Sequence, residues 1–370
     1  MARKGILFCM RFPDDEGFVW RTVVTVRDRA AGLLEDYHCH VAFPQLTGNS
    51  AHDIEHMRPV EIDAYALTPA DKAKLRAFVA EHDIAAIVYM SALPTTLDMG
   101  FLHSLGVKTI NTEQDSFDHR VRDSFVRRAA KFVVRRGLKR QLHDLHVANS
   151  VSQRDWLQQY ALIPPSRLAL AADGVDCEHF TPGREREGTA GFNIICAGQS
   201  RPEKRIDMIL RVASRIMAQP EFDHVRLTYV GAGEMLGEWQ RLAETLGIAH
   251  RVHFAGQQRD LLPFYRDADL MVHAAERESF GLVLAEAMAC GLPVVASAAA
   301  GPSEIVADGK TGRLIALDDE DGFLAAVEAY LRDPAMVRQH GAAARSRVVE
   351  RFSMDRQVRD LAAAIEGALE

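Results

Sequence analysis

ERESFGLVLAEAMACGLPVVASAAAG, residues Glu276–Gly301, is the stretch that decides the fold. It predicts a loop with two glutamates, an amphipathic helix that carries Glu286, and a buried strand after Gly291. The N-terminus of a helix has unpaired N–H groups and a partial positive charge, so it suits a phosphate or a diphosphate. Carboxylates beside it suit a vicinal diol, because an ionised glutamate accepts two hydrogen bonds. The stretch therefore favours a ligand of the sugar-nucleotide class.

The composition predicts a soluble globular protein of two domains. The chain has 370 residues, which is too long for one ordinary core. Its residues are 48% hydrophobic and 26% charged, as in a soluble globular protein. A formal net charge of -7 argues against a dedicated nucleic-acid binder. Five scattered cysteines without C-x-x-C spacing predict reduced thiols in a cytoplasmic protein. We expect neither a signal peptide nor a transmembrane segment.

Strand-like and helix-like segments alternate along the first half of the chain, which predicts a parallel sheet covered by helices. We expect strands at Gly5–Met10, Tyr37–Phe43, Ala85–Met90, Val107–Ile110 and His146–Ser150. We expect helices at Thr22–Glu35, Asp71–His82 (capped by Thr68 and Pro69), Thr95–Leu105 and Asp155–Tyr160, with an irregular segment at Gln45–Val60.

A second run of alternating elements starts at Asn193, after a linker that begins near Ala172. Its expected strands are Asn193–Ala197, Val225–Val230, Val252–Phe254 and Leu270–Ala274, followed by a hairpin-like step at Thr311–Gly312. Its expected helices include Asp321–Arg332, Pro334–Arg351 and Met354–Leu369. We therefore predict one domain over residues 1–175 and another over 185–350, with 353–370 packing back on the first.

Loops that follow the strands of the first half carry candidate ligand contacts, because ligands gather at the carboxyl ends of parallel strands. The loop after the first strand offers Gly17. The loop after Ile110 offers Glu113, Gln114, Asp115, Asp118 and His119. Ordinary surface loops, and a helix cap at Asp115 or Ser116, explain the same residues and stay open as alternatives.

His38 and His40 lie on one face of a predicted strand. A metal site needs a third ligand and none is nearby, so we interpret the two as packed histidines and expect no metal. Residues 120–140 predict a strongly basic amphipathic helix. We expect its apolar stripe to pack on a sheet, and peripheral contact of its charges with an anionic membrane stays open.

Two loops of the second half carry a further phosphate signal. In GQSRPEKR (198–205), Gly198 permits a close turn, and Arg201, Lys204 and Arg205 could neutralise a diphosphate, although such residues are usually only solvated. In GAGE (231–234), two glycines predict a tight turn, but the full dinucleotide fingerprint is absent.

These motifs, in this order and spacing, resemble the retaining glycosyltransferases of family four, also called glycosyl transferases group 1. The resemblance covers nearly all of 172–314 and extends to the first half only in layout and in VANSVS (147–152). The matching motifs are GVD…F-x-P, PEK, VGAGE, RVHFAG, E-x7-E with EAMACGLPVVAS, G-x-x-E-I-V and DGKTG.

The resemblance implies the GT-B fold, with two Rossmann-like domains facing a central cleft. It implies transfer of a hexose from a nucleoside-diphosphate sugar, such as a UDP or GDP sugar, to a glycan or glycolipid acceptor. Anomeric retention and independence of metals and cofactors are part of the same expectation, as is a place in polysaccharide biosynthesis.

The same resemblance assigns individual roles. It places Glu278 at the donor sugar, Glu286 at the ribose and Lys204 at the diphosphate, and treats Glu276 as a neighbour only. The backbone N–H groups of four successive residues would bind the sugar and the diphosphate, namely Ser279, Phe280, Gly281 and Leu282. The catalytic candidates are Glu278, Lys204 and His119.

Two positions depart from the family pattern. Gln199 stands where an arginine is common, and Gln114 where a histidine is common. Arg201 or Arg205 could replace the first, and Glu113 or His119 the second. Two alternatives therefore stay open: a non-catalytic sugar-nucleotide-binding partner subunit of another transferase, and a GT-B epimerase or phosphorylase.

Overall fold

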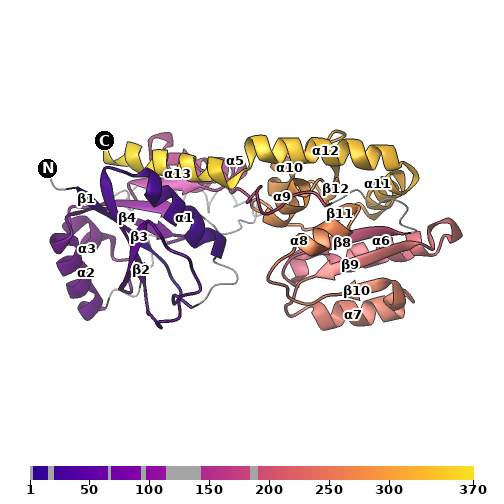
Figure 1. Cartoon of the computed structure of the whole chain (residues 1–370), viewed down its shortest axis with the longest axis horizontal. Coiled ribbons are helices and arrows are strands. Elements are labelled where there is room, and N and C mark those ends of the chain that lie inside the picture. The colour runs from indigo at the N-terminus through magenta and orange to yellow at the C-terminus, as the bar shows by residue number, and fades with distance from the viewer. Residues whose placement is uncertain (1–2, 16–20, 66–67, 93–96, 114–142, 184–190) are drawn as a thin grey trace, which may run out of the picture. The chain divides into compact units, whose positions relative to one another are not determined.

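The computed structural model describes residues 3–15, 21–65, 68–92, 97–113, 143–183 and 191–370. They form two compact units (Figure 1). Of the described residues, the first unit contains those up to Ala172 and also Asp355–Glu370, while the second contains Asp173–Met354. The C-terminal helix α13 (Met354–Leu369), yellow in Figure 1, thus belongs almost entirely to the first unit.

The first unit is built on a seven-stranded parallel sheet with the order β3-β2-β1-β4-β5-β6-β7. The direction of strand addition reverses between β1 and β4. The strands are β1 (Lys4–Cys9), β2 (Tyr37–Phe43), β3 (Met57–Glu61), β4 (Ile84–Met90), β5 (Lys108–Thr112), β6 (Leu145–Ala148) and β7 (Leu168–Leu170). The described helices before α13 are α1 (Arg21–Leu33), α2 (Pro69–Glu81), α3 (Met99–Ser104) and α5 (Val151–Gln159).

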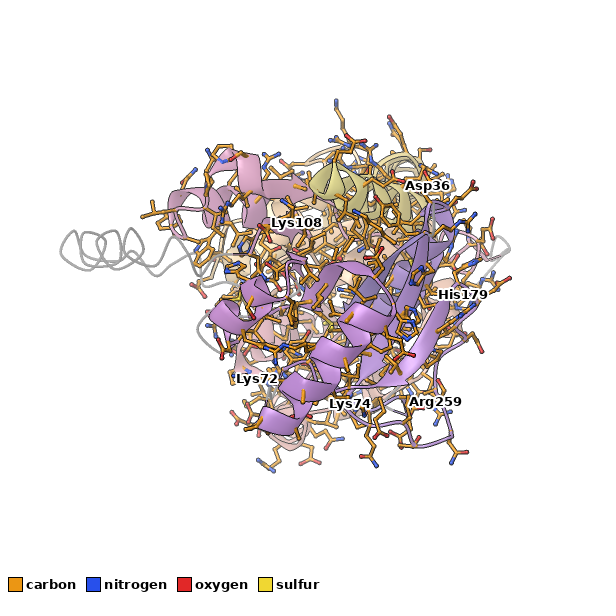
Figure 2. The ribbon with its side chains drawn as sticks, turned by 90° about the vertical axis from the view of Figure 1, so that its left-hand side faces the viewer. Asp36, Lys72, Lys74, Lys108, His179 and Arg259 are labelled. Atoms are coloured by element: carbon orange, nitrogen blue, oxygen red, sulfur yellow. The ribbon has the colours of Figure 1, made fainter. Side chains whose placement is uncertain are left out.

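Helix α2 begins as the sequence predicts. The hydroxyl of Thr68 accepts a hydrogen bond from the backbone N–H of Asp71, and the Asp71 carboxylate accepts one from the N–H of Thr68. This capping box satisfies two donors that the helix leaves open, and a proline follows the cap. The helix buries Leu75 and Val79 in the core, while Lys74 is exposed on the face seen in Figure 2.

The second unit has a six-stranded parallel sheet with the order β10-β9-β8-β11-β12-β13, which reverses between β8 and β11. Its strands are β8 (Phe192–Ala197), β9 (Val225–Val230), β10 (Val252–Phe254), β11 (Leu270–His273), β12 (Val294–Ser297) and β13 (Gly312–Ile315). Its helices are α6 (Ile206–Met217), α7 (Leu236–Thr245), α8 (Leu262–Asp267), α9 (Leu282–Ala289), α10 (Ala300–Ile305), α11 (Glu320–Arg332) and α12 (Pro334–Arg351).

The structure corrects the prediction at three short strands. The segment expected to be irregular contains β3, whose Pro59 is tolerated because β3 is an edge strand. Strand β7 has only three residues and lies in a stretch without a strand signal. The expected hairpin-like step at Thr311–Gly312 is instead the start of β13, which pairs in parallel with β12.

Helix α9 is also different from the expectation. It was expected to be amphipathic, but most of its residues are buried in a core cluster of the second unit. Its sequence LVLAEAMA is apolar on nearly every side, as is usual for a helix that neighbouring elements cover all round. Glu286 is therefore a carboxylate within an apolar helix, and its surroundings matter for its charge.

No helix among the described residues combines the length and the apolar character needed to cross a bilayer. The five cysteines, which all lie among the described residues, form no disulfide bonds, and four of them are buried.

Two glycine turns bring the loops after β8 and β9 together. The N–H of Gly198 donates to the carbonyl of Val230 at 3.0 Å, and the N–H of Ser200 donates to the carbonyl of Ala232 at 2.8 Å. Gly231 has a φ of +159°, and a Cβ there would lie 1.9 Å from the carbonyl oxygen of Gly198. The two loops can approach this closely only because residue 231 has no side chain.

We expect Gly231→Ala to lower the free energy of unfolding by about 3 kcal/mol or more, because the new methyl group meets backbone that cannot move aside. Gly247→Ala is the matched control, since Gly247 also has a positive φ, +73°, but has open space around its Cβ position. Its cost should be the conformational strain alone, about 1–2 kcal/mol. Urea unfolding of both variants gives the comparison, and equal losses would contradict the close contact of the two loops.

Candidate functional site

The candidate site of the second unit lies where its strand order reverses. The connections after β8 and β11 leave the sheet toward opposite sides, and such a switch point is where doubly wound sheets bind ligands. Lys204 lies in the connection after β8, and Glu278 lies in the connection after β11. The fold therefore brings the two loops of the sequence analysis to the same edge of one sheet.

Lys204 and Glu278 form an ion pair across this switch point. The Lys204 Nζ lies 2.6 Å from the Glu278 Oε2, and the two side chains are only 19% and 13% exposed. The buried His273, at the end of β11, places its Nε2 3.5 Å from the same oxygen. Burial by itself raises the pKa of the Glu278 carboxyl, but His273 and Lys204 outweigh burial and lower this pKa to about 2. Glu278 is thus ionised at neutral pH.

The segment between Glu278 and α9 is fixed by backbone contacts. Gly281 is the N-cap of α9 with φ 107°, a conformation that favours glycine. The N–H of Gly301, in α10, donates to the carbonyl of Glu278 at 2.9 Å. A Cβ at Gly301 would lie 2.2 Å from the carbonyl oxygen of Phe280, so α10 packs directly on this turn. The first N–H groups of α9, which lack intrahelical partners, are therefore held in place beside Glu278.

Glu286 sits in a different environment from Glu278. It lies in the second turn of α9, and its Oε2 accepts a hydrogen bond from the hydroxyl of the buried Tyr265 at 2.8 Å. Burial raises the pKa of Glu286 to about 7, and the Tyr265 hydrogen bond offsets only part of that effect. The carboxylate therefore lacks a strong partner for its charge and favours further hydroxyl donors.

The two arginines of the basic loop 198–205 differ in whether they form ion pairs. Arg205 has a left-handed backbone, with φ 52°, and pairs with Glu276 at 2.7 Å, with Asp207 at 3.6 Å and with Asp318. Arg201 is exposed and makes no side-chain ion pair with the described residues. Of the two arginines considered as substitutes at Gln199, Arg201 is therefore the available one. Glu276 pairs with Arg205 and lies two residues before Glu278 in the chain.

The candidates of the first unit are only partly described. Glu113 is buried, and its Oε1 accepts hydrogen bonds from Asn111 Nδ2 at 2.7 Å and contacts His146 Nδ1 at 3.0 Å. This network joins the end of β5 to His146 within β6, so Glu113 is held by internal partners. The other candidates lie outside the described residues, namely Gly17, Gln114, Asp115, Asp118, His119 and the basic segment 120–140.

Three relevant residues were not identified from the sequence. His273 and Tyr265 belong to segments whose apolar composition predicts only that they are part of a core. The position of His273 at the end of a strand was the one sign in the sequence that it could lie at a site. The interpretation of His38 and His40 was wrong in one respect, because a third histidine, His82, does stand beside them. It comes from the end of α2, far away in the sequence.

The comparisons with known proteins agree with this geometry. Residues 183–347 match the family model described as Glycosyl transferases group 1. These residues form a group 1 glycosyltransferase domain. The match confirms the resemblance seen in the motifs between Gly198 and Leu314, which lie within this glycosyltransferase domain.

Curated relatives are about one third identical to the chain over the residues that align. A D-inositol 3-phosphate glycosyltransferase of Geodermatophilus obscurus is 34% identical over 247 residues, which are 61% of this chain and 53% of the relative. One of Frankia alni is 33% identical over 204 residues, covering 51% of this chain and 50% of the relative. The chain thus spans about half the length of the curated relatives it matches.

Solved glycosyltransferase structures share the fold of the whole chain. A glycosyltransferase from Rickettsia africae has a TM-score of 0.78 at 16% identity and covers 100% of both chains. HepE of Anabaena, solved with UDP and glucose, has a TM-score of 0.74 at 18% identity over 98% of this chain and 100% of its own. The predicted fold class, GT-B with two Rossmann-like parallel-sheet domains, is confirmed.

A double-mutant cycle tests the central ion pair. Lys204→Met should lower the free energy of unfolding at pH 7 by about 2–4 kcal/mol, because it leaves the Glu278 charge largely buried without its cation. Glu278→Gln should lose less, and the double variant should be more stable than the sum of the two losses predicts. Because the folded-state pKa is depressed, this stabilisation is present above the unfolded pKa of 4.5 and is lost as pH falls toward about 2.

Arg215→Met is the control for the cycle, because it breaks an ion pair with Asp321 in which both side chains are exposed, 45% and 84%. Its effect should be small. Chemical unfolding at several pH values provides the data. Additive losses for Lys204→Met and Glu278→Gln would exclude the proposed coupling.

Proposed function

We propose that this protein is a retaining glycosyltransferase that moves a hexose from a nucleoside-diphosphate sugar to a glycan or glycolipid acceptor. The observation that carries the proposal is the switch-point arrangement of Lys204, Glu278 and the start of α9. It combines a cation and a helix N-terminus, which suit a diphosphate, with two carboxylates, which suit hydroxyl groups. A sugar nucleotide presents this combination of groups.

Binding of the donor would change the contacts of the ion pair between Lys204 and Glu278. A diphosphate bound at the start of α9 would attract the Nζ of Lys204, now 2.6 Å from Glu278. Glu278 would then accept hydrogen bonds from hydroxyls of the sugar, while Glu286 would accept those of the ribose. The exposed Arg201 would add charge at the diphosphate. A helix terminus and cations stabilise the departing diphosphate without a metal in this proposal.

We infer retention from the resemblance of the motifs to the retaining glycosyltransferases of family four. A carboxylate that accepts hydrogen bonds from sugar hydroxyls orients the donor without attacking the anomeric carbon. The acceptor would then attack on the face from which the diphosphate leaves. The anomeric configuration of an isolated product, measured by NMR coupling constants, decides this part of the proposal.

The printed names of similar proteins support a choice of the donors and acceptors to try first. HepE of Anabaena was solved with UDP and glucose, so UDP-glucose comes first among the donors to be tried. The curated relatives are named for inositol 3-phosphate, which therefore joins glycans and glycolipids in the acceptor panel. We also propose action at the cytoplasmic membrane surface, on the strength of the basic residues in 120–140 alone.

A thermal-shift panel of nucleoside diphosphates and their sugars tests donor binding. We expect one base to raise the melting temperature, and Glu286→Ala to weaken that ligand by about 10- to 100-fold, because a hydrogen bond to a charged group is worth about 1.5–3 kcal/mol. Glu244→Ala, which removes an exposed glutamate of α7, is the control and should keep the full shift. An undiminished shift in Glu286→Ala would exclude the ribose assignment.

A release assay then separates an enzyme from a binding subunit. The ligand that gives the shift is incubated as its sugar nucleotide with the acceptor panel, and the free nucleoside diphosphate is measured. Release that Lys204→Met abolishes supports the transferase. Binding without release for every acceptor, and without donor hydrolysis, would favour the non-catalytic partner subunit.

Binding should also depend on pH through Glu286. Burial raises the pKa of its carboxyl to about 7 in the free protein, and hydroxyl donors of a ligand favour the ionised form. Affinity should therefore rise by up to about tenfold per pH unit below pH 7 and level off above it. A sugar nucleotide is the suitable ligand, because its diphosphate has no terminal phosphate to titrate in this range. Calorimetry should show a flat profile for Glu286→Gln; a wild-type profile that is equally flat would contradict the role of this carboxylate.

A further inference from the structure

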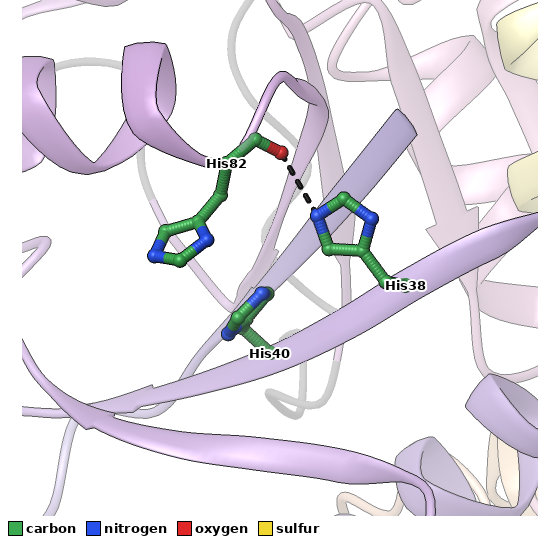
Figure 3. A group of neighbouring side chains, drawn as sticks. All are labelled: His38, His40 and His82. Atoms are coloured by element: carbon green, nitrogen blue, oxygen red, sulfur yellow. Dashed lines mark hydrogen bonds between the residues drawn. The ribbon is translucent and has the colours of Figure 1, made fainter. Parts of the chain in front are cut away.

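Three histidines gather at the edge of the first sheet where β1, β2 and β4 begin. His38 and His40 project from β2, and His82 follows the last residue of α2 (Figure 3). One ring nitrogen of each lies within 4.8 Å of the corresponding nitrogens of the other two. The ring centroids of His40 and His82 are 4.7 Å apart, and those of His38 and His40 are 5.4 Å apart.

Backbone geometry holds this group together. The Nε2 of His38 is hydrogen-bonded to the carbonyl oxygen of His82 at 2.9 Å, which ties β2 to the turn between α2 and β4. Gly5 of β1 pairs with His38 in the sheet. A Cβ at Gly5 would lie 2.7 Å from both the His38 Nε2 and the His82 oxygen, so the absence of a side chain there makes room for the ring and the turn.

His40 is the unusual member of the group. Its side chain is buried, and its Nε2 is a buried nitrogen with no hydrogen-bond partner. A buried polar atom without a partner is rare in native proteins, and an absent water or ion is one of its common causes. His40 thus brings a nitrogen without a hydrogen-bond partner to a group of three rings whose ligand nitrogens lie within 4.8 Å of one another.

We propose that His38, His40 and His82 bind one Zn²⁺ ion. Imidazole nitrogen is a preferred ligand of Zn²⁺, and three histidines with a fourth position for water or a carboxylate form a common zinc coordination set. Glu81 offers a carboxylate for that position, since its Oε1 lies 4.0 Å from the His82 Nε2.

Binding requires a small contraction of the cluster. Zn–N bonds of about 2.0–2.1 Å place tetrahedral ligands about 3.3 Å apart, so the nitrogens must approach by about 1 Å or more. Rotation of the partly exposed His38 and His82 side chains supplies this movement. The metal competes with the His82 carbonyl for the His38 Nε2, and this hydrogen bond is the contact that it replaces.

The ion serves the stability of the first unit. The three histidines lie at the amino ends of the strands, whereas ligands of doubly wound sheets bind at the carboxyl ends. The ion therefore joins β2 to the α2–β4 turn and takes no part in glycosyl transfer. This inference stands independently of the proposed function, because its residues and its assay involve no nucleotide.

Titration of Co²⁺ into protein purified without a histidine tag tests the site, because Co²⁺ replaces Zn²⁺ and its visible absorption reports coordination. We expect one equivalent to bind, Zn²⁺ to displace it, and Zn²⁺ to raise the melting temperature. His40→Ala and His82→Ala should each weaken Co²⁺ binding by more than about tenfold. His250→Ala removes an exposed histidine of the second unit and should change nothing.

His82→Gln provides a second variant in case an alanine disturbs folding, and circular dichroism confirms the fold of each protein used. No saturable Co²⁺ binding by the wild-type protein would overturn the proposal. Equal affinity in wild type, His40→Ala and His82→Gln would overturn it as well, since the bound ion would then lie elsewhere.

Discussion

A buried carboxylate needs a compensating charge, and Glu278 obtains it from the other side of a reversal in strand order. Lys204 follows β8 and Glu278 follows β11, so their 2.6 Å ion pair joins two loops that leave the sheet in opposite directions. Without the reversal, the two loops would not meet at one point of the sheet edge. In the proposed function, an anion that attracted Lys204 would leave the Glu278 carboxylate in need of new hydrogen-bond donors.

Glu278 and Glu286 are carboxylates of one short segment, yet their environments drive their pKa values in opposite directions. His273 and Lys204 outweigh burial at Glu278 and hold its pKa near 2, whereas at Glu286 burial outweighs the Tyr265 hydrogen bond and the pKa rises to about 7. At neutral pH the Glu278 carboxyl is therefore ionised, whereas the Glu286 carboxyl is close to its midpoint of titration.

Most of the fold could be predicted from the sequence, because the long elements have a clear period and clear ends. Helix α12 and strand β9 have the predicted bounds, since Pro334 marks the start of one and an apolar run defines the other. Strands β3 and β7 have five residues or fewer and no comparable pattern. Gly312 predicts a turn, yet it lies in β13, where the absence of a side chain lets the strand approach β12 closely. A Cβ at Gly312 would lie 2.2 Å from the carbonyl oxygen of Val294.

The candidate site was predictable where a motif carries it and not where packing creates it. Lys204, Glu278 and Glu286 stand in recognisable motifs, but Tyr265 and His273 sit in apolar segments and look like core residues. His82 follows His40 by 42 residues, and only the pairing of β2 with β1, and of β1 with β4, brings it near. The strands of a parallel sheet all have their amino ends on one side and their carboxyl ends on the other. A metal site at the amino ends, as we propose, would therefore leave the loops at the carboxyl ends unchanged.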